Sequence, residues 1–380
     1  MTADVMAEAP GKLALAGEFA VLEPGHPGIV AAVSRKVTAK IHWGEAGLTA
    51  QGRSCAWRLD GRAAVASLSD QPFGLIARAM SVAFAFLEAQ GVHPESFSLR
   101  LSDTMHDEMG VKLGLGSSAA TAVAVLAAVL SAFGKTSDRL TLFKLAVIAH
   151  RLALGPGSGI DVAASVYGGH LLYRGVAQRW LQGLLSRGGA AAVGDITTRT
   201  WPDLMLEPLP QPALTMQVGW TGEAASTADQ LRRLGQRRRL HPEAYRCFLA
   251  QSDTGVMKLA HALRNADPMT LLDAVQGLRH ALWRLSFELA MPIETARLSR
   301  LADLAESFGG AGKPSGAGGG DCGIAFVPGN ASRALEQSWR EQDLTPLDIE
   351  AGADGVFVAQ DSALSLAASG ASPEPISGSA

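Results

Sequence analysis

The stretch GVKLGLGSSAATAVAVLAAVL, residues 110–130, combines two spaced glycines, two serines and a long apolar run without charge. A membrane-spanning helix needs about 20 consecutive apolar residues. The apolar run at 119–133 is shorter than that and is rich in alanine. It therefore predicts a buried helix preceded by a tight turn, rather than a membrane segment.

The turn in front of this helix has the features of an anion site. Gly114 and Gly116 can adopt a positive φ, which lets backbone N–H groups converge on one point. Ser117 and Ser118 stand where the helix begins, and the free N–H groups and the dipole of a helix N-terminus favour phosphate. Lys112 adds a cation suited to a triphosphate. A glycine–serine cap on a core helix is the alternative that the turn alone leaves open.

Two common phosphate-binding motifs do not fit this turn. The ordinary P-loop, GxxxxGK[ST], requires a lysine after its second glycine, and none follows here. Gly114, Gly116 and Ala119 match GxGxxA, but a dinucleotide-binding unit requires an apolar strand directly before the glycines and an acid near the end of the next strand. DTMHDEMGVK precedes them instead, and the next acid, Asp138, opens a helix. The turn therefore predicts a phosphate-binding loop of a different fold.

Composition and charge set the broad class of the protein. The 380 residues are 47% hydrophobic and carry a formal net charge of −3, so we expect a globular protein without a nucleic-acid or membrane partner. The basic segment 231–240 lacks interleaved aromatic residues, so we expect a solvated helix face there. Cys55, Cys247 and Cys322 form no CxxC pair, and the N-terminus lacks a signal-peptide pattern, which predicts a reduced, cytoplasmic setting.

The order of the predicted elements indicates two α+β domains, each with one glycine-rich loop. Composition changes around 181–213, so we place the first domain at 1–208, the second at 209–365 and a disordered tail at 366–380. Helices are expected at 72–90, 137–154, 226–239, 242–265, 268–290 and 293–308, and strands at 96–103, 170–174 and 322–327.

Asp161 follows a glycine-rich turn in GPGSGIDVAASVYGG and has apolar residues on both sides. A carboxylate in such a setting is partly desolvated, so it must be paired or used in chemistry. Phosphoryl transfer needs a phosphate cradle, a metal, a cation near the γ-phosphate and a group that orients or deprotonates the acceptor. Asp161 suits the last role, and Lys12, in APGKLALAGE, is the candidate cation beside it. The alternatives are a helix N-cap for Asp161 and a solvated lysine for Lys12.

Three stretches in this order resemble the GHMP kinase superfamily, whose small-molecule kinases have a glycine-rich loop unlike the P-loop. APGKLALAGEFAVL is similar to its first motif, GLGSSAA to its second and SGAGGGDCGIAF to its third, and the likeness covers most of residues 8–360. Within the superfamily, AGEFAVLEPG, GWTGEAAST, LTPLDIEAGADGV and the lysine before the second motif resemble the phosphomevalonate kinase family.

This resemblance implies a fold and a reaction. The implied fold is an N-terminal ribosomal-S5-like domain followed by a C-terminal ferredoxin-like domain. The implied reaction transfers phosphate from ATP, with Mg²⁺, to 5-phosphomevalonate and gives 5-diphosphomevalonate for isoprenoid synthesis. The implied cofactors are thus ATP and Mg²⁺, and the implied partner is a small phosphorylated acceptor.

The resemblance also implies roles for individual residues. Asp161 matches the catalytic aspartate, and Lys12 matches the lysine beside it. The implied phosphate-binding residues are Lys112, Gly114, Leu115, Gly116, Ser117 and Ser118, with the Ser118 hydroxyl toward the metal. The implied acceptor-binding residues are Glu18, Ser158, Ser226, Thr227, Gly316, Ala317, Gly318 and Gly319.

Several positions depart from the superfamily pattern. His150 stands eleven residues before Asp161, where mevalonate kinases have a metal-binding glutamate; this argues against that activity and leaves a second protein ligand to Mg²⁺ open. We expect His150 to be packed beneath the loop. Phe19 replaces the usual tyrosine and removes a hydroxyl that would orient the acceptor.

Arg151 and Lys313 are further cations near these motifs, and we interpret both as ordinary solvated charges. Another GHMP kinase, such as a mevalonate kinase-like enzyme, the related diphosphomevalonate decarboxylase and a catalytically silent member of the fold remain as alternatives. The sequence leaves both a monomer and a homodimer open.

Overall fold

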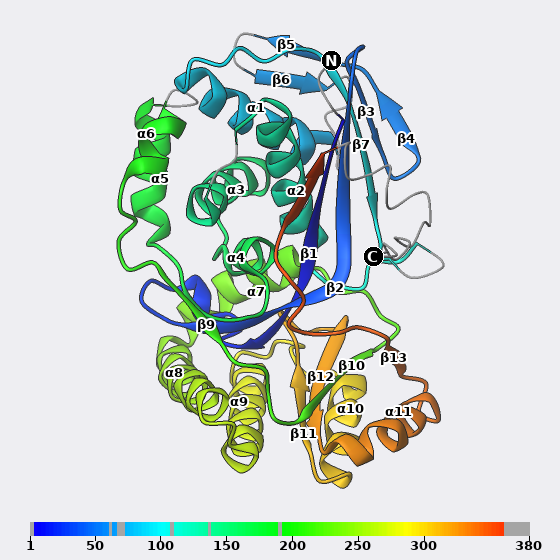
Figure 1. Cartoon of the computed structure of the whole chain (residues 1–380). Helices are drawn as coiled ribbons and strands as arrows, with labels where there is room; N and C mark the ends of the chain where they lie inside the picture. Colours follow the sequence, from blue (N-terminus) through cyan, green and yellow to red (C-terminus); the bar gives the residue numbers. More distant parts are fainter. Residues whose placement is uncertain are drawn as a thin grey trace, which may run out of the picture.

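The computed structural model describes residues 4–60, 63–66, 73–106, 110–135, 138–188 and 192–360. These residues form two layered units, drawn one above the other in Figure 1. The predicted tail at 366–380 lies outside the described residues.

The upper unit is built on an eight-stranded sheet in the order β14-β1-β2-β7-β3-β4, with β8 paired to β2 and β9 paired to β8. Its strands are β1 Val5–Ala16, β2 Gly28–Trp43, β3 Gly47–Ala50, β4 Arg53–Cys55, β7 Phe97–Asp103, β8 His170–Arg174, β9 Met205–Leu209 and β14 Phe357–Gln360. The long strand β2 pairs with β1 along most of its length, with β7 at its C-terminal end and with β8 at its N-terminal end. A separate hairpin joins β5 Trp57–Asp60 to β6 Ala63–Ala66.

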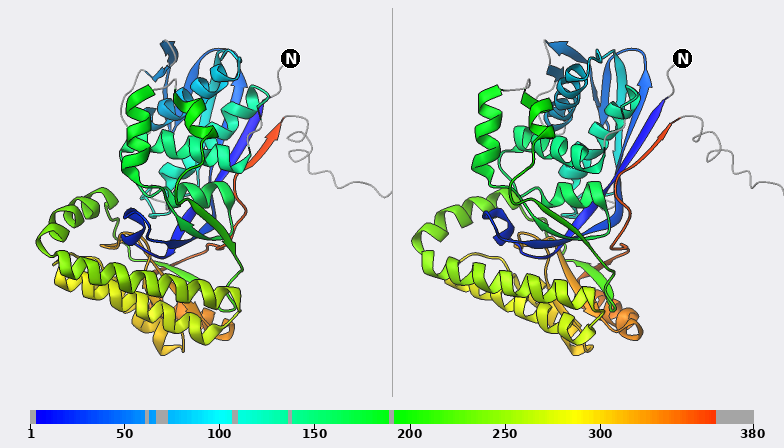
Figure 2. Two further views of the ribbon diagram at one scale, coloured as in Figure 1. Left: turned by 90° about the vertical axis from the view of Figure 1, so that its left-hand side faces the viewer. Right: turned by 60° about the vertical axis from the view of Figure 1, so that its left-hand side comes forward.

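Helices cover one face of this sheet, as Figures 1 and 2 show. They are α1 Phe73–Ala89, α2 Ser117–Ala132, α3 Arg139–Leu154, α4 Ile160–Tyr167, α5 Gln178–Gly188 and α6 Val193–Thr198. Helix α2 packs against β1 and β2, with α1, α3 and α4 around it, and its residues 122–131 are all buried. A helix that is apolar on every side is stable only when it is enclosed in this way, so the predicted buried helix is confirmed. Within the described ranges, no helix has both the length and the apolar character that crossing a bilayer requires.

The lower unit contains an antiparallel sheet in the order β11-β12-β10-β13. Its strands are β10 Thr215–Trp220, β11 Ala311–Pro314, β12 Cys322–Val327 and β13 Thr345–Leu347. Its helices are α7 Thr227–Leu240, α8 Pro242–Arg264, α9 Pro268–Glu288, α10 Ala296–Ser307 and α11 Ser332–Arg340. Helices α8 and α9 pack on each other, and α10 packs on β11 and β12. The short 3₁₀ turns η1 Ala20–Leu22 and η3 Gly329–Ala331 complete the elements.

The elements expected from periodicity agree with the structure, except around 181–213. Each of the six predicted helices begins and ends within three residues of an observed one. The segment interpreted as an irregular boundary instead contains most of α5, all of α6 and strand β9. The buried ring of Trp201 packs against Trp180 and Phe143, which anchors these short helices to α3. Tertiary contacts of this kind stabilise helices too short to be recognised by periodicity.

The division into domains at residue 208 stays a prediction, and one strand departs from it. Strand β14 belongs to the range predicted for the second domain, yet it pairs antiparallel with β1, from Val5↔Gln360 to Glu8↔Phe357. Pairing satisfies the backbone groups that β1 would otherwise leave exposed as an edge strand. The chain thus returns to the upper sheet after building the lower one.

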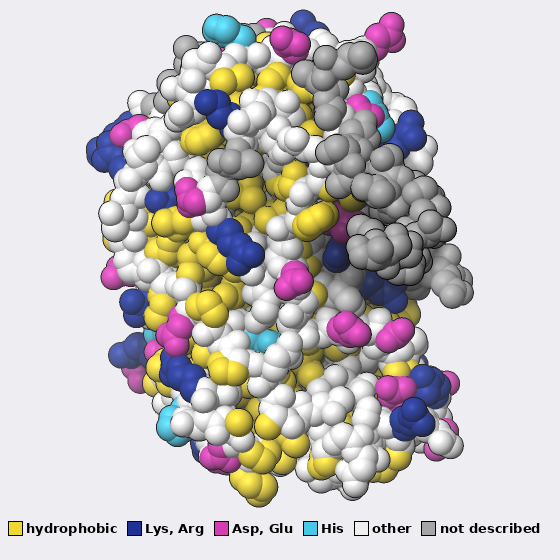
Figure 3. Space-filling view, in the orientation of Figure 1, with side chains coloured by type: hydrophobic (Ala, Val, Ile, Leu, Met, Phe, Trp, Pro, Cys, Tyr) yellow, Lys and Arg dark blue, Asp and Glu magenta, His cyan; other side chains and the backbone are white. Residues whose placement is uncertain are grey.

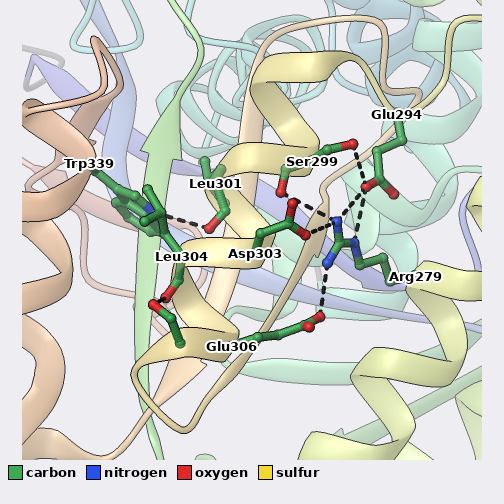
Figure 4. Close-up of polar contacts among 9 residues, drawn as sticks. Arg279, Glu294, Ser299, Leu301, Asp303, Leu304, Glu306 and Trp339 are labelled. Carbon is green, nitrogen blue, oxygen red and sulfur yellow. Dashed lines mark hydrogen bonds and ion pairs between the residues drawn. The ribbon is translucent and has the colours of Figure 1, made fainter.

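An ion cluster fixes the segment that precedes α10 (Figure 4). The guanidinium of Arg279, on α9, donates to Glu294 at 2.8 Å, to Asp303 at 2.6 Å and to Glu306 at 2.8 Å. The Glu294 side chain is 1% exposed, so this carboxylate depends on its partners for compensation of lost hydration. The cluster holds α9, α10 and the residues next to Glu294 in one arrangement.

Positive and negative side chains are interspersed on the face of the molecule seen in Figure 3. The basic segment 231–240 forms the C-terminal part of α7, and Arg232, Arg233, Arg237 and Arg239 are exposed, as expected for a solvated face. Arg238 instead forms an ion pair with Glu23 and lies over the ring of Tyr245.

Candidate active site

The side chain of Lys12 lies between the two glycine-rich loops, which are 112–118 (the first glycine loop) and 316–320 (the second glycine loop). On β1, its backbone N–H donates to the Leu115 carbonyl at 2.8 Å, and its Nζ donates to the Gly114 carbonyl at 3.4 Å. A Cβ placed on Gly116 would lie 2.9 Å from Cγ of Lys12, and one on Gly316 would lie 3.9 Å from its Nζ. The two loops, about 200 residues apart in sequence, therefore meet at this lysine.

The first glycine loop has the backbone conformation that the sequence predicted. Gly114 and Gly116 have φ values of 75° and 79°, and Gly116 is the left-handed N-cap residue of α2. Ser117 and Ser118 are the first residues of that helix, so their free N–H groups stand where an anion would bind. Lys112 is exposed at the start of the loop.

Asp161 stands in the first turn of α4, and its side chain is 24% exposed. The N-cap of that helix is Gly159, so the alternative in which Asp161 is the N-cap residue is wrong. The hydroxyl of Ser165 donates to both the Asp161 carbonyl and the Pro10 carbonyl, at 3.2 and 2.8 Å. This contact ties α4 to β1 two residues before Lys12.

His150, on α3, lies between the first glycine loop and Asp161. Its Nε2 is 3.1 Å from the Ser118 hydroxyl oxygen and 3.9 Å from Oδ2 of Asp161. The imidazole is packed beneath the loop, as expected, and it brings Ser118 and Asp161 to one place. The sequence placed these three residues in separate motifs, and helix packing joins them.

The second glycine loop is tightly packed. Gly316, Gly318, Gly319 and Gly320 all have positive φ values. A Cβ on Gly318 would lie 2.2 Å from the Ile293 carbonyl, and the Gly319 N–H donates to that same carbonyl at 2.8 Å. Because Ile293 adjoins Glu294, the ion cluster of Figure 4 supports this loop. Packing alone therefore requires glycine at 318, whatever the loop binds.

Four further residues predicted to bind the acceptor lie in loops or at the start of a helix. Ser226 is the N-cap of α7, and its hydroxyl accepts from the Asp229 N–H at 3.2 Å, while Thr227 is exposed. The Ser158 hydroxyl accepts from the Ile160 N–H at 3.3 Å. The loop residue Ala317 packs against the cluster that contains Phe19.

Glu18 and Lys313 form a buried ion pair that joins the two units. Their side chains are 1% and 0% exposed, and the Lys313 ammonium also donates to the Pro314 carbonyl at 2.8 Å. The interpretation of Lys313 as a solvated charge is wrong, because its chain folds inward to meet a carboxylate 295 residues away. Glu18, predicted as an acceptor contact, turns its carboxylate toward this lysine, and its role toward the acceptor stays a prediction.

Arg151 is likewise not a free surface charge. Its guanidinium donates to the side-chain amide oxygens of Gln178 and Gln182, both on α5. Burial lowers the pKa of this guanidinium, which remains a cation at any physiological pH. Four cations were considered from the sequence. Lys112 lies in the first glycine loop, and Lys12 lies beside that loop on β1.

Asp321 is a residue that sequence reasoning missed. It directly follows the second glycine loop, has a φ of 51°, and its Oδ1 accepts from the Ala225 N–H at 2.9 Å. Burial raises the pKa of this carboxyl, an effect that the nearby Lys12 opposes. The sequence does contain a pattern that indicates Asp321. Like Asp161, it is an acid that follows a glycine-rich turn and precedes an apolar run, here CGIAFV.

Comparison with known proteins decides the family. Residues 75–169 match the model of the GHMP kinases N terminal domain, and residues 259–342 match that of the GHMP kinases C terminal domain. A phosphomevalonate kinase of Streptomyces sp. (strain CL190) is 34% identical over 93% of this chain and 98% of that protein. The chain belongs to the GHMP kinases.

Solved structures extend the likeness of this GHMP kinase. A Lin0012 protein from Listeria innocua is 31% identical, with a TM-score of 0.89 over 94% of this chain and 99% of that one. A Streptococcus pneumoniae phosphomevalonate kinase in complex with phosphomevalonate and AMPPNP is 26% identical, with a TM-score of 0.79 over 91% and 99%. These matches confirm the predicted α+β GHMP kinase fold and the predicted likeness to phosphomevalonate kinases, and hence the class of enzyme, a phosphotransferase.

The hydroxyl oxygen at the predicted metal site of this GHMP kinase suits Mg²⁺. Ser118 stands in the first turn of α2, with its hydroxyl oxygen 3.1 Å from Nε2 of His150. Within the described ranges, no group of three or more His, Cys, Asp and Glu side chains is placed to hold a metal ion. Mg²⁺ in kinases is commonly held by one or two protein oxygens together with substrate phosphates and waters, so the single hydroxyl oxygen of Ser118 fits it.

Replacing Gly114 with alanine is expected to weaken nucleotide binding by this GHMP kinase by about 10-fold or more. The new Cβ would lie 2.7 Å from the Asp321 carboxylate, at a φ of 75° that alanine rarely adopts, so the loop must move. Isothermal titration calorimetry with a non-hydrolysable ATP analogue measures the change in Kd.

Gly134→Ala is the matched control for this substitution. Gly134 also has a positive φ, 68°, but a Cβ there would have no atom within 4 Å beyond its chain neighbours. It is expected to lower stability slightly and leave the Kd unchanged. Equal Kd values for the two alanine variants would contradict a phosphate-binding role for the first glycine loop.

Proposed function

We propose that this GHMP kinase transfers the γ-phosphate of ATP to the phosphate group of 5-phosphomevalonate, giving ADP and 5-diphosphomevalonate in the mevalonate route to isoprenoids. The observation that carries the proposal is the likeness to a phosphomevalonate kinase of Streptomyces, 34% identical over 98% of its length. The meeting of both glycine loops at Lys12 supports it, because the reaction must hold two phosphorylated groups together.

The first glycine loop binds the triphosphate in this proposal. Backbone N–H groups at the N-terminus of α2, with Lys112, offset the charge of the β- and γ-phosphates. The Ser118 hydroxyl would hold Mg²⁺, which supplies neutralisation of charge on the phosphate oxygens when bound.

Lys12 and Asp161 act on the acceptor. Lys12 places its ammonium between the two glycine loops, where it stabilises the oxygens around the transferred phosphoryl group. A phosphate monoester loses its second proton near pH 6, so at pH 7 most of the acceptor is already a dianion. Asp161 takes up the remaining proton where one is present, and it orients a dianionic oxygen through the cation Lys12, because two anionic oxygens alone repel each other.

We further propose a cytoplasmic location and action as a monomer or homodimer. The three cysteines, all within the described residues, are unpaired, which suits a reducing compartment.

Release of ADP from ATP with four acceptors tests the proposal: mevalonate, 5-phosphomevalonate, 5-diphosphomevalonate and galactose, each at the same concentration. We expect turnover with 5-phosphomevalonate, and kcat/KM for mevalonate and galactose lower by about 100-fold or more, because sites that pair with a phosphate lose that energy with a neutral group. Turnover with mevalonate or galactose alone would contradict the proposed substrate. No turnover with any acceptor would indicate a catalytically silent member of the fold.

A further inference from the structure

The backbone of Asp321 locks it to the turn 221–225 in front of α7. Its N–H donates to the Glu223 carbonyl at 2.7 Å, and its carbonyl accepts from both the N–H and the hydroxyl of Thr221, each at 3.0 Å. Its Oδ1 accepts from the Ala225 N–H at 2.9 Å. Main chain and side chain thus hold the turn that leads directly to Ser226 and Thr227, the residues predicted to bind the acceptor.

The other side of the same carboxylate rests on the first glycine loop. A Cβ on Gly114 would lie 2.7 Å from both Cγ and Oδ2 of Asp321, so the carboxylate occupies the space that a side chain at 114 would need. The following residue, Cys322, donates its thiol to the Leu113 carbonyl at 3.1 Å. Two consecutive residues of the lower unit therefore contact two consecutive residues of the first glycine loop.

The charge of this carboxylate is offset on one side. Lys12, whose Nζ donates to the Gly114 carbonyl, interacts favourably with Asp321. A carboxylate beside a predicted triphosphate site repels the nucleotide, so its presence there needs a compensating benefit. The contacts above supply one, because a single side chain connects the turn at 221–227 with the loop at 112–118.

We propose that Asp321 is a positioning residue that sets the acceptor-side turn 221–227 against the first glycine loop, and so fixes the acceptor relative to the γ-phosphate. This inference rests on the proposed function. Asp321 acts through Ala225 and Gly114, and it neither carries a proton in the reaction nor touches the transferred phosphoryl group.

Steady-state kinetics of Asp321→Ala and Asp321→Asn with ATP and 5-phosphomevalonate test the proposal. Asp321→Ala removes the hydrogen-bond partner of the Ala225 N–H. We therefore expect KM for 5-phosphomevalonate to rise by about 10-fold or more and kcat to fall, because small misplacements of a substrate slow the reaction. The Kd of a non-hydrolysable ATP analogue is expected to be unchanged or lower, because a negative charge beside the loop is lost. Asp321→Asn keeps an oxygen that accepts from the Ala225 N–H, so its KM for 5-phosphomevalonate is expected to stay close to the wild-type value.

Asp267→Ala is the control for a merely structural effect. Asp267 caps α9 by accepting from the Met269 and Thr270 N–H groups, so its loss lowers stability away from both loops. We expect it to lower the thermal midpoint while leaving both kinetic constants at the wild-type values.

Two results would overturn the inference. One is an Asp321→Ala variant that loses affinity for the ATP analogue and for 5-phosphomevalonate equally, or that loses affinity for neither. The other is an Asp321→Asn variant no better than Asp321→Ala. The proposed function fails separately, when the wild-type enzyme does not phosphorylate 5-phosphomevalonate. In that case the Kd of 5-phosphomevalonate, measured by calorimetry without nucleotide, still reports whether Asp321→Ala disturbs the turn.

Discussion

Replacing Asp161 with asparagine is expected to lower kcat by about 100-fold or more while leaving the Kd of ATP nearly unchanged. Asparagine has the shape of aspartate, so α4 and its link to β1 through Ser165 are kept. The negative charge 3.9 Å from Nε2 of His150 is lost, and with it the group that we propose to orient the attacking oxygen. Single-turnover rates with saturating ATP and 5-phosphomevalonate measure the effect on the chemical step.

Asp138→Asn is the matched control for Asp161→Asn. Asp138 caps α3, where its carboxylate accepts from the Thr141 N–H at 2.9 Å and from the Thr141 hydroxyl at 2.7 Å. Asparagine is as good an N-cap as aspartate, so this variant is expected to keep the wild-type rate. If Asp161→Asn kept it too, the conclusion would be that Asp161 is a structural residue of the helix.

Replacing Lys313 with methionine is expected to reduce the free energy of unfolding by about 3–5 kcal/mol. Methionine fills much of the volume of the lysine chain, so the principal loss is that of the ammonium. The Glu18 carboxylate, 1% exposed, is then left buried without its partner. Urea unfolding followed by tryptophan fluorescence measures the difference.

Two further variants separate charge from packing at this pair. Lys258→Met breaks an ion pair with Asp273 whose side chains are 40% and 66% exposed, and it is expected to cost less than about 1 kcal/mol. Adding Glu18→Leu to Lys313→Met removes the unpaired charge and is expected to recover most of the lost stability. A Lys313→Met variant no less stable than Lys258→Met would refute the importance of the buried pair.

The first glycine loop and its helix could be predicted from the local sequence pattern. Left-handed glycines at 114 and 116 and an apolar helix from Ser117 follow from residues that are neighbours in the chain. The same holds for α8, because burial on one face imposes a helical period that can be read directly. It holds as well for the strand at 170–174, whose first four residues form a continuous buried run. Backbone conformation at these positions depends on the residue itself more than on its distant contacts.

Other features depended on contacts that no local pattern encodes. Trp201, in a segment expected to be irregular, is buried against Phe143, and β14 adds to the edge of β1. Asp321 reaches the first glycine loop from more than 200 residues away. Each of these depends on which distant surfaces the folded chain brings together, and many surfaces of similar composition would have been compatible with the same sequence.

By itself, then, the sequence determined the motifs, the helices and the candidate chemistry of this GHMP kinase, since torsional preference and hydrophobic period act over a few residues. Tertiary structure alone decided which charges are available for that chemistry. It buried Lys313 against Glu18, turned Arg151 toward α5 and left Lys12 between the loops. A charged side chain takes the partner that best replaces its lost hydration, and only the folded chain determines which partner is within reach.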